Sequence, residues 1–291
     1  MTPLELLRKD GSELFIEAQS IAKKRKSLFA TGLQINTICR IHPPCRHCLW
    51  FTRERYTPNF RRKVPLDQIV KQAKEAKRQE IDRIYLASGW MGKDLSDDVY
   101  EAVIAIKEQV DIDLYGMFGT INQRSLLRLQ KAGIDGYRCS LESPNPDLFN
   151  YLKPGDSLDN RIETLKSAKE IGLPIWSEFI IGVGENDQDI VNGIEMLKKL
   201  EVNTFLFVPF RPVPFIEMEE RSGPNPYQMA KVMAAARIFI PDADMFAVYN
   251  NMEWGYRAGC NGAFVSTYPN NVTRFREMRE MLNESYPGKT G

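Results

Sequence analysis

Three cysteines within ten residues are the strongest chemical signal in this sequence. Cys39, Cys45 and Cys48 stand in the pattern Cys-x5-Cys-x2-Cys. Three thiolates on one loop can hold three corners of an iron–sulfur cluster and leave the fourth iron open for a small molecule, because thiolate is the usual ligand of such clusters. A zinc site in which His42 or His47 supplies the fourth ligand is the main alternative. A chance grouping of structural cysteines is the other.

The overall composition is that of an ordinary globular protein. Hydrophobic residues make up 43% and charged residues 26% of the 291 residues, which excludes a largely disordered chain. Lys and Arg number 39 against 38 Asp and Glu, so a net charge of +1 offers no bulk attraction for nucleic acid or an anionic membrane. No signal peptide or membrane-spanning apolar run is visible. Five cysteines, an odd number, are too few for a disulfide framework, and we expect a cytoplasmic protein.

The elements that must position these cysteines alternate along nearly the whole chain, with short β-rich runs between longer helical patterns. About eight β-α units predict an α/β fold of the (β/α)8 TIM-barrel type, whose loops after the strands form the active-site face. A doubly wound open sheet is the alternative. No linker divides the chain, so we expect one domain over residues 1–291 with an N-terminal helix. The expected strands lie at 32–36, 83–87, 112–115, 136–141, 174–181, 204–208, 245–249 and 263–265, and the expected helices at 3–26, 66–79, 97–109, 123–132, 158–171, 187–200, 227–239, around Trp254 and at 272–282.

Short motifs follow several of the expected strands. Ala-Ser-Gly-Trp-Met stands at 87–91, and Leu-Glu-Ser at 141–143 is followed by Asn-Pro-Asp-Leu-Phe at 145–149. Glu-Phe-Ile-Ile-Gly-Val-Gly-Glu stands at 178–185, and Arg-Ala-Gly-Cys-Asn-Gly at 257–262. A Ser-Gly pair after a strand is by itself usually only a turn.

Together with the cysteines, these motifs resemble the radical S-adenosylmethionine (SAM) superfamily over roughly residues 27 to 285. Within it they resemble the subgroup of biotin synthase, the hydrogenase maturase HydE and methylornithine synthase. The superfamily usually carries Cys-x3-Cys-x2-Cys after the first strand. The x5 spacing here resembles instead the HmdB family, which is associated with making the iron-guanylylpyridinol cofactor of [Fe]-hydrogenase. Pro43 and Pro44 can bend the longer loop back so that the three sulfurs converge.

The resemblance implies SAM contacts beside the cysteine loop. His47 takes the position of the aromatic residue that precedes the third cysteine in the superfamily. Ser88, Gly89 and Trp90 stand where the superfamily has a Gly-Gly-Glu-type turn, whose backbone carbonyls accept hydrogen bonds from the SAM amino group. Trp90 replaces the glutamate of that turn, so only the backbone role carries over.

The resemblance also implies contacts from the middle of the chain. Glu142 matches the glutamate that contacts SAM in HydE and methylornithine synthase, and Arg161 matches the arginine that pairs with the SAM carboxylate. These charges complement a cofactor that carries both signs. Ile180 falls in a stretch similar to Gly-x-Ile-x-Gly-x-x-Glu, which lies beside the adenine. The alternative for Glu142 and Arg161 is an ordinary surface charge.

Two further charged residues are candidate substrate contacts. Glu178 replaces the first glycine of the adenine motif, so it either faces the barrel lumen or forms an ordinary strand salt bridge. Arg211 follows the strand at 204–208 and is a candidate for an acidic substrate group, or a surface charge. Cys139 and Cys260 stand alone and are expected to be packing residues.

The resemblance implies an enzyme with a 4Fe-4S cluster on Cys39, Cys45 and Cys48 that binds SAM and cleaves it reductively to a 5′-deoxyadenosyl radical. The implied partners are a small-molecule substrate and a one-electron donor such as ferredoxin or flavodoxin, with no nucleic acid and no membrane. The favoured role is biosynthesis of the iron-guanylylpyridinol cofactor. The alternatives are another radical SAM mutase or HydE-like maturase, and a non-catalytic carrier of an iron–sulfur cluster or zinc.

Overall fold

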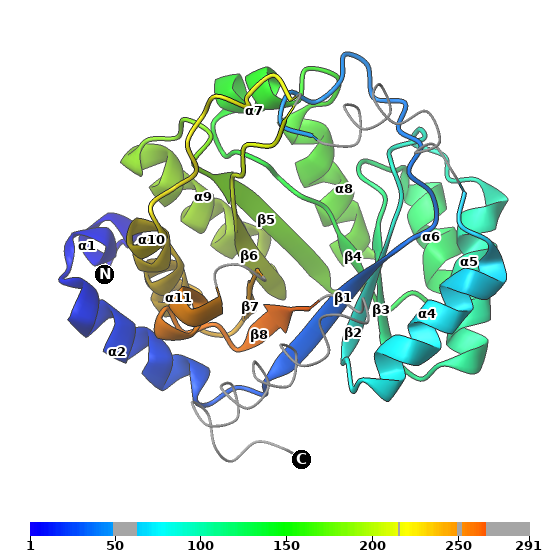
Figure 1. Cartoon of the computed structure of the whole chain (residues 1–291), viewed down its shortest axis with the longest axis horizontal. Helices are drawn as coiled ribbons and strands as arrows, with labels where there is room; N and C mark the ends of the chain where they lie inside the picture. Colours follow the sequence, from blue (N-terminus) through cyan, green and yellow to red (C-terminus); the bar gives the residue numbers. More distant parts are fainter. Residues whose placement is uncertain (49–62, 215, 249–251, 266–291) are drawn as a thin grey trace.

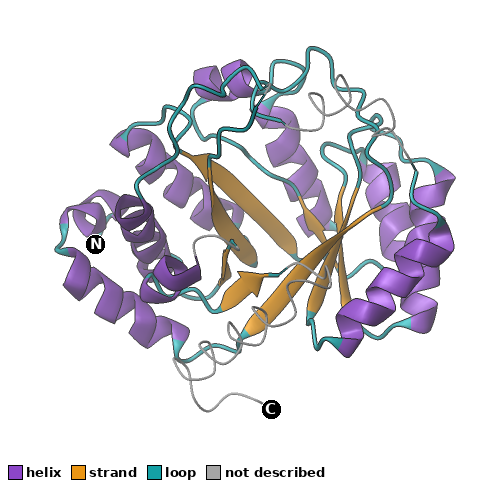
Figure 2. Ribbon diagram, viewed as in Figure 1, coloured by secondary structure: helices purple, strands orange, loops and turns teal. Residues whose placement is uncertain are grey.

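Eight parallel strands close into a single barrel in the structure of this chain, a computed structural model that describes residues 1–48, 63–214, 216–248 and 252–265. Neighbouring strands pair in chain order from β1 to β8, and β8 pairs with β1. Helices lie around the outside of the barrel wall (Figure 1 and Figure 2). The closed order confirms the predicted (β/α)8 barrel and excludes the doubly wound open sheet.

The strands are short and in parallel register. Ala30 of the first strand pairs with Arg83 of the second, and Leu28 pairs with Gly262 of the last to close the barrel. The bounds are β1 Leu28–Gln34, β2 Arg83–Ala87, β3 Asp113–Met117, β4 Gly136–Arg138, β5 Ile175–Ile181, β6 Thr204–Pro209, β7 Asp244–Ala247 and β8 Gly262–Phe264.

Most of the helices begin at a residue whose side chain caps the backbone. Asn122 accepts a hydrogen bond from the Ser125 backbone at one end of α6, and Gly133 ends it with a left-handed φ of 102°. Among the described helices, none is both long and apolar enough to cross a bilayer. The outer helices are α4 Leu66–Arg78, α5 Asp97–Gln109, α6 Gln123–Ala132, α7 Pro146–Leu152, α8 Leu158–Glu170, α9 Asp187–Leu200, α10 Pro226–Phe239 and α11 Met252–Arg257.

The N-terminal segment departs from the prediction of one helix at 3–26. It forms two helices, α1 Pro3–Arg8 and α2 Gly11–Ala22. The break falls at Asp10, whose carboxylate accepts a hydrogen bond from the Ser12 backbone N–H at 2.9 Å and so starts a new helix. The short helix α7 was not predicted, and the expected helix at 272–282 lies outside the described residues.

Inward side chains fill the lower barrel with aromatic rings. On β5, Trp176, Glu178 and Ile180 face the barrel axis at successive depths, because alternate strand residues point to the same face. Trp176 lies deepest, with its ring centroid 5.0 Å from that of Phe246. The rings that meet around it form what we call the aromatic plug: Tyr85, Tyr115, Trp176, Phe246 and Phe264.

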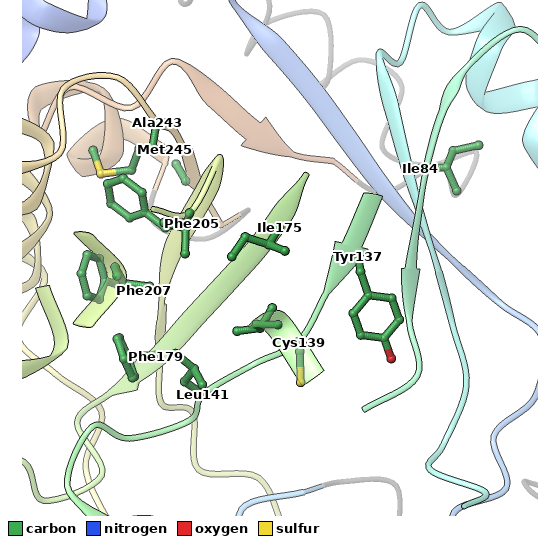
Figure 3. Packing of buried hydrophobic residues seen from close by; sticks show 14 of the residues in the cluster. Ile84, Tyr137, Cys139, Leu141, Ile175, Phe179, Phe205, Phe207, Ala243 and Met245 are labelled. Atoms are coloured by element: carbon green, nitrogen blue, oxygen red, sulfur yellow. The ribbon is translucent and has the colours of Figure 1, made fainter. Parts of the chain in front are cut away.

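Outward side chains of the same strands build the main core against the helices. Figure 3 shows Phe179 of β5 near Phe205 and Phe207 of β6, three fully buried rings on the helix side of the wall. The strand alternation therefore separates an outer core, which stabilises the barrel, from an inner column of side chains that is available for a site.

Candidate active site

The cysteine loop follows β1 and is fastened to two other segments of the barrel rim. The Arg40 N–H donates to the carbonyl of Trp90 at 2.7 Å, which ties the loop to the turn after β2. The Arg46 N–H donates to the carbonyl of Leu152 at 2.9 Å, which ties it to the end of α7. Gly155 also lies against the loop, where a Cβ would come 2.5 Å from the Pro43 carbonyl oxygen. The long x5 insert is thus held by its neighbours.

All three clustered cysteines line one cavity of about 410 Å³ at the C-terminal ends of the strands, which we call the barrel cavity. Cys39, Cys45 and Cys48 are in no disulfide and are partly buried. Burial raises the pKa of the Cys45 thiol, an effect that the nearby Lys153 ammonium opposes. In the described part of the chain, no three His, Cys, Asp or Glu side chains converge as ligands of one metal ion. A cluster has a different requirement, because it takes each thiolate on a separate iron.

The turn after β2 lies in contact with the cysteine loop. Ser88, Gly89 and Trp90 all line the barrel cavity. Gly89 has no room for a side chain, since a Cβ there would lie 2.1 Å from the Ile38 carbonyl oxygen. The Trp90 indole N–H donates to the Thr120 carbonyl at 2.9 Å, which ties this turn to the segment after β3. The structure thus brings this turn to the first cysteine.

Glu142 is the charged centre of the cavity wall. Its backbone has a left-handed φ of 55°, and its carboxylate accepts from Lys153 Nζ at 3.0 Å, Arg161 Nη1 at 3.3 Å and Ser140 Oγ at 2.8 Å. Burial alone would raise the pKa of Glu142, but Lys153 and Arg161 hold that pKa well below its ordinary value. Glu142 is therefore ionised. Its left-handed backbone conformation is strained, and such strain is typical of residues at functional sites.

Arg161 reaches the same cavity from α8. Arg161 is 3% exposed, and its guanidinium donates to the Asp156 carboxylate at 2.7 Å and to the Ser140 carbonyl. The predicted pair Glu142 and Arg161 is thus brought together in direct contact, and both side chains line the cavity. The surface-charge alternative does not describe either residue.

His47 is buried beside this cluster. Its Nε2 lies 3.8 Å from a Glu142 oxygen, while its buried Nδ1 has no hydrogen-bond partner in the described structure. Burial lowers the pKa of His47, although Glu142 opposes that shift, so the imidazole is neutral at neutral pH. His42 is exposed and does not line the cavity.

Of the two candidate substrate residues, Glu178 lines the barrel cavity and Arg211 does not. Glu178 and Ile180 line the cavity, and Glu178 is also salt-bridged, with Arg138 Nη2 at 3.1 Å. Arg211 is exposed and lies outside the cavity wall. Cys139 lines the cavity as well as packing in the core, and burial raises the pKa of its thiol to about 12.

Two charged cavity residues were missed by the sequence analysis. Lys153 is 8% exposed, and although burial and Arg161 lower its pKa, Glu142 raises the pKa overall, so it stays charged. Its position in the Leu-Lys-Pro-Gly run was the available signal. Arg138 is 6% exposed and lies in β4. An arginine between core residues of a strand was the sequence feature that could have indicated a buried charge.

Comparisons with known proteins agree with this geometry. Residues 33–197 match the sequence profile of the Radical SAM superfamily. The chain is 23% identical to biotin synthase of Carboxydothermus hydrogenoformans, over 96% of this chain and 90% of that protein. It is 28% identical to an uncharacterized protein of Methanocaldococcus jannaschii, over 75% of this chain and 59% of that protein.

Solved structures share the fold. The structure of methylornithine synthase (PylB) aligns with a TM-score of 0.83 at 17% identity, over 95% of this chain and 90% of that one. The hydrogenase maturase HydG from Carboxydothermus hydrogenoformans aligns with a TM-score of 0.79 at 19% identity, over 90% of this chain and 66% of that one.

The cavity residues fit the cofactors of that superfamily, which are a 4Fe-4S cluster and SAM. Three cysteines that form no disulfide supply a donor set that leaves one iron of a cluster open. A tight backbone turn and a buried carboxylate and guanidinium line the same cavity, as a cofactor with both charges requires. The profile match covers more than half of the chain, and the chain belongs to the radical SAM superfamily.

Proposed function

We propose that this enzyme is of the HmdB type and acts in biosynthesis of the iron-guanylylpyridinol cofactor. The observation that carries the proposal is the Cys-x5-Cys-x2-Cys spacing, with all three cysteines lining the barrel cavity. Backbone hydrogen bonds to Trp90 and Leu152 hold the longer loop in place, which supports a role for its length in forming the site.

The proposal assigns the chain's own residues to binding and orientation. Cys39, Cys45 and Cys48 hold the cluster, and the backbone of residues 88–90 accepts from the SAM amino group. Arg161 pairs with the SAM carboxylate, and Glu142 contacts SAM while Lys153 keeps it charged. When bound, the cluster and SAM supply one-electron cleavage of SAM and a 5′-deoxyadenosyl radical that abstracts a substrate hydrogen. The barrel wall excludes water from that chemistry.

The enzyme is expected to work with two partners, a substrate and an electron donor. The substrate is a small molecule that fits above the aromatic plug, and the electron comes from a ferredoxin or flavodoxin. The absence of a disulfide at all five cysteines and an oxygen-sensitive cluster suit a reducing cytoplasm, where we expect the enzyme to work.

The first experiment tests the chemistry. Anaerobically reconstituted protein should contain about four irons and four sulfides per chain and, with SAM and a reductant, release 5′-deoxyadenosine. Cys45→Ser is the matched inactive variant. One zinc per chain without sulfide, or no 5′-deoxyadenosine, contradicts the assignment.

The second experiment tests the pathway. A cell extract that makes guanylylpyridinol is depleted of the endogenous protein and supplied with this enzyme or with Cys45→Ser, and the product is followed by mass spectrometry. Restoration by the wild-type protein alone supports the HmdB role. If the protein cleaves SAM but does not restore guanylylpyridinol synthesis, the chain would be assigned to another radical SAM mutase or maturase reaction.

A further inference from the structure

Between the aromatic plug and the SAM-binding residues lies a buried ion pair, Arg138 of β4 with Glu178 of β5. The Arg138 Nε lies 3.1 Å from one Glu178 oxygen, and Nη2 lies 3.1 Å from the other. Both side chains line the barrel cavity, and they are 6% and 3% exposed. The pair is therefore part of the cavity wall and well removed from solvent.

The guanidinium is fixed in orientation by aromatic stacking. The Arg138 Cζ lies 4.4 Å from the Tyr85 ring centroid and 4.7 Å from the Trp176 centroid. A guanidinium stacked on rings and doubly bonded to a carboxylate has little freedom to rotate. Its remaining nitrogen therefore points in one defined direction.

That remaining nitrogen receives no hydrogen-bond acceptor from the residues that the structure describes. Arg138 Nη1 is buried and makes no hydrogen bond in the described structure. The Gln34 Oε1, on β1, lines the same cavity and is also buried without a partner. A buried donor or acceptor left unpaired is costly, and such atoms in a cavity call for a ligand that completes them.

We infer that Arg138 Nη1 binds a carboxylate of the substrate, and that Gln34 Oε1 accepts an N–H or O–H from the same molecule. The substrate class is thus a small carboxylic acid with a nearby hydrogen-bond donor. This inference rests on the proposed function, which supplies the reaction but not the substrate.

Charge favours a carboxylate over other acceptors. Arginine stays charged, so its hydrogen bond is stronger to an anion than to a neutral carbonyl. The Glu178 carboxylate beside this guanidinium repels a bound anion. It would repel a phosphate dianion more strongly than a carboxylate monoanion. Glu178 is a positioning residue here, because its carboxylate is bonded to Arg138 and holds that guanidinium in place.

The test uses reconstituted protein saturated with SAM, so that the SAM carboxylate site is filled. The probes are two acid and amide pairs, glycolate with glycolamide and benzoate with benzamide, and their affinities are measured by ligand-observed NMR. The wild type should bind each acid at least about tenfold more tightly than its amide.

Three variants separate the site from the fold. Arg138→Met combined with Glu178→Gln removes the ion pair without leaving a buried charge alone, and it should lose the acid preference. Glu178→Gln alone should raise acid affinity several-fold by removing a negative neighbour, which a structural role would not do. Arg83→Met is the matched control, because Arg83 also contacts Trp176 but does not line the cavity, and it should keep the preference.

The outcomes are distinct from those of the proposed function. Loss of acid preference in the double variant with unchanged SAM affinity supports the inference. An acid preference that survives the double variant, or no preference in the wild type, overturns it. Failure to release 5′-deoxyadenosine would instead strike the proposed function, because the acid preference needs no turnover.

Discussion

Gly89→Ala tests whether the turn after β2 fixes the first cluster cysteine. A Cβ at residue 89 would lie 2.1 Å from the Ile38 carbonyl oxygen and 2.8 Å from the Cys39 Cβ. Ordinary contact begins near 3.4 Å, so the cysteine loop must retreat by about 1.3 Å in a closely packed region. Metal sites hold ligand distances to within about 0.2 Å, so this displacement is several times too large for Cys39 to keep its place.

We expect Gly89→Ala to bind less iron and sulfide after anaerobic reconstitution, and to lose about 1–3 kcal/mol of stability through overpacking. The matched control is Gly92→Ala. Gly92 has a left-handed φ of 131° and open space around its Cα, so alanine there adds backbone strain of about 1–3 kcal/mol without touching the loop. Its iron content should equal that of the wild type.

Iron and sulfide per chain, and the melting temperature of the protein before reconstitution, measure the two effects separately. Full iron content in Gly89→Ala would refute the reasoning. Equal iron loss in both variants would mean that backbone strain, and not contact with the cysteine loop, controls the cluster.

Three further predictions concern the charged wall and the thiols. Serine at any cluster cysteine, such as Cys45, should abolish iron binding, whereas Cys260→Ser and His47→Ala should retain it; iron loss in His47→Ala would indicate a Cys3His zinc site. Arg161→Ala should keep its iron but bind SAM at least about tenfold more weakly by calorimetry, because a charge-assisted pair is lost; unchanged SAM affinity would show that Arg161 has another role. The pKa of Glu142 is held below its ordinary 4.5, so its contribution to stability is complete above pH 4.5 and is lost as the pH falls below that value. The melting temperature of Glu142→Gln should therefore lie below that of the wild type at neutral pH and approach it in acid, and a constant difference would contradict the coupling.

Much of the fold could be predicted because local signals agree with it. The predicted bounds of α5, α6 and α9 are those of the structure, and Asn122, Asn186 and Gly133 mark ends of the last two. The break at Asp10 and the helix α7 were missed. In each case an Asp or Asn cap competes with the surrounding pattern, and short helices have little periodicity to reveal them.

The site was less accessible to sequence reasoning. The motifs identified Glu142 and Arg161, but not that Lys153 completes their charge cluster, because that contact spans α7, a helix that the sequence pattern does not reveal. Arg138 was overlooked because an arginine in a strand is expected to reach solvent. Here the barrel turns it inward, onto the aromatic rings and Glu178.

The aromatic plug has a consequence for traffic through the enzyme. Its rings fill the lower barrel, so among the residues that the structure describes the cavity above them is closed from below and opens at the rim that carries the cysteine loop. A molecule seated against Arg138 must leave by the route through which it entered. Only one end of a long substrate can be inserted, and its remainder stays outside beyond the rim. Product must therefore depart before the next substrate arrives, which makes release a separate gate on turnover.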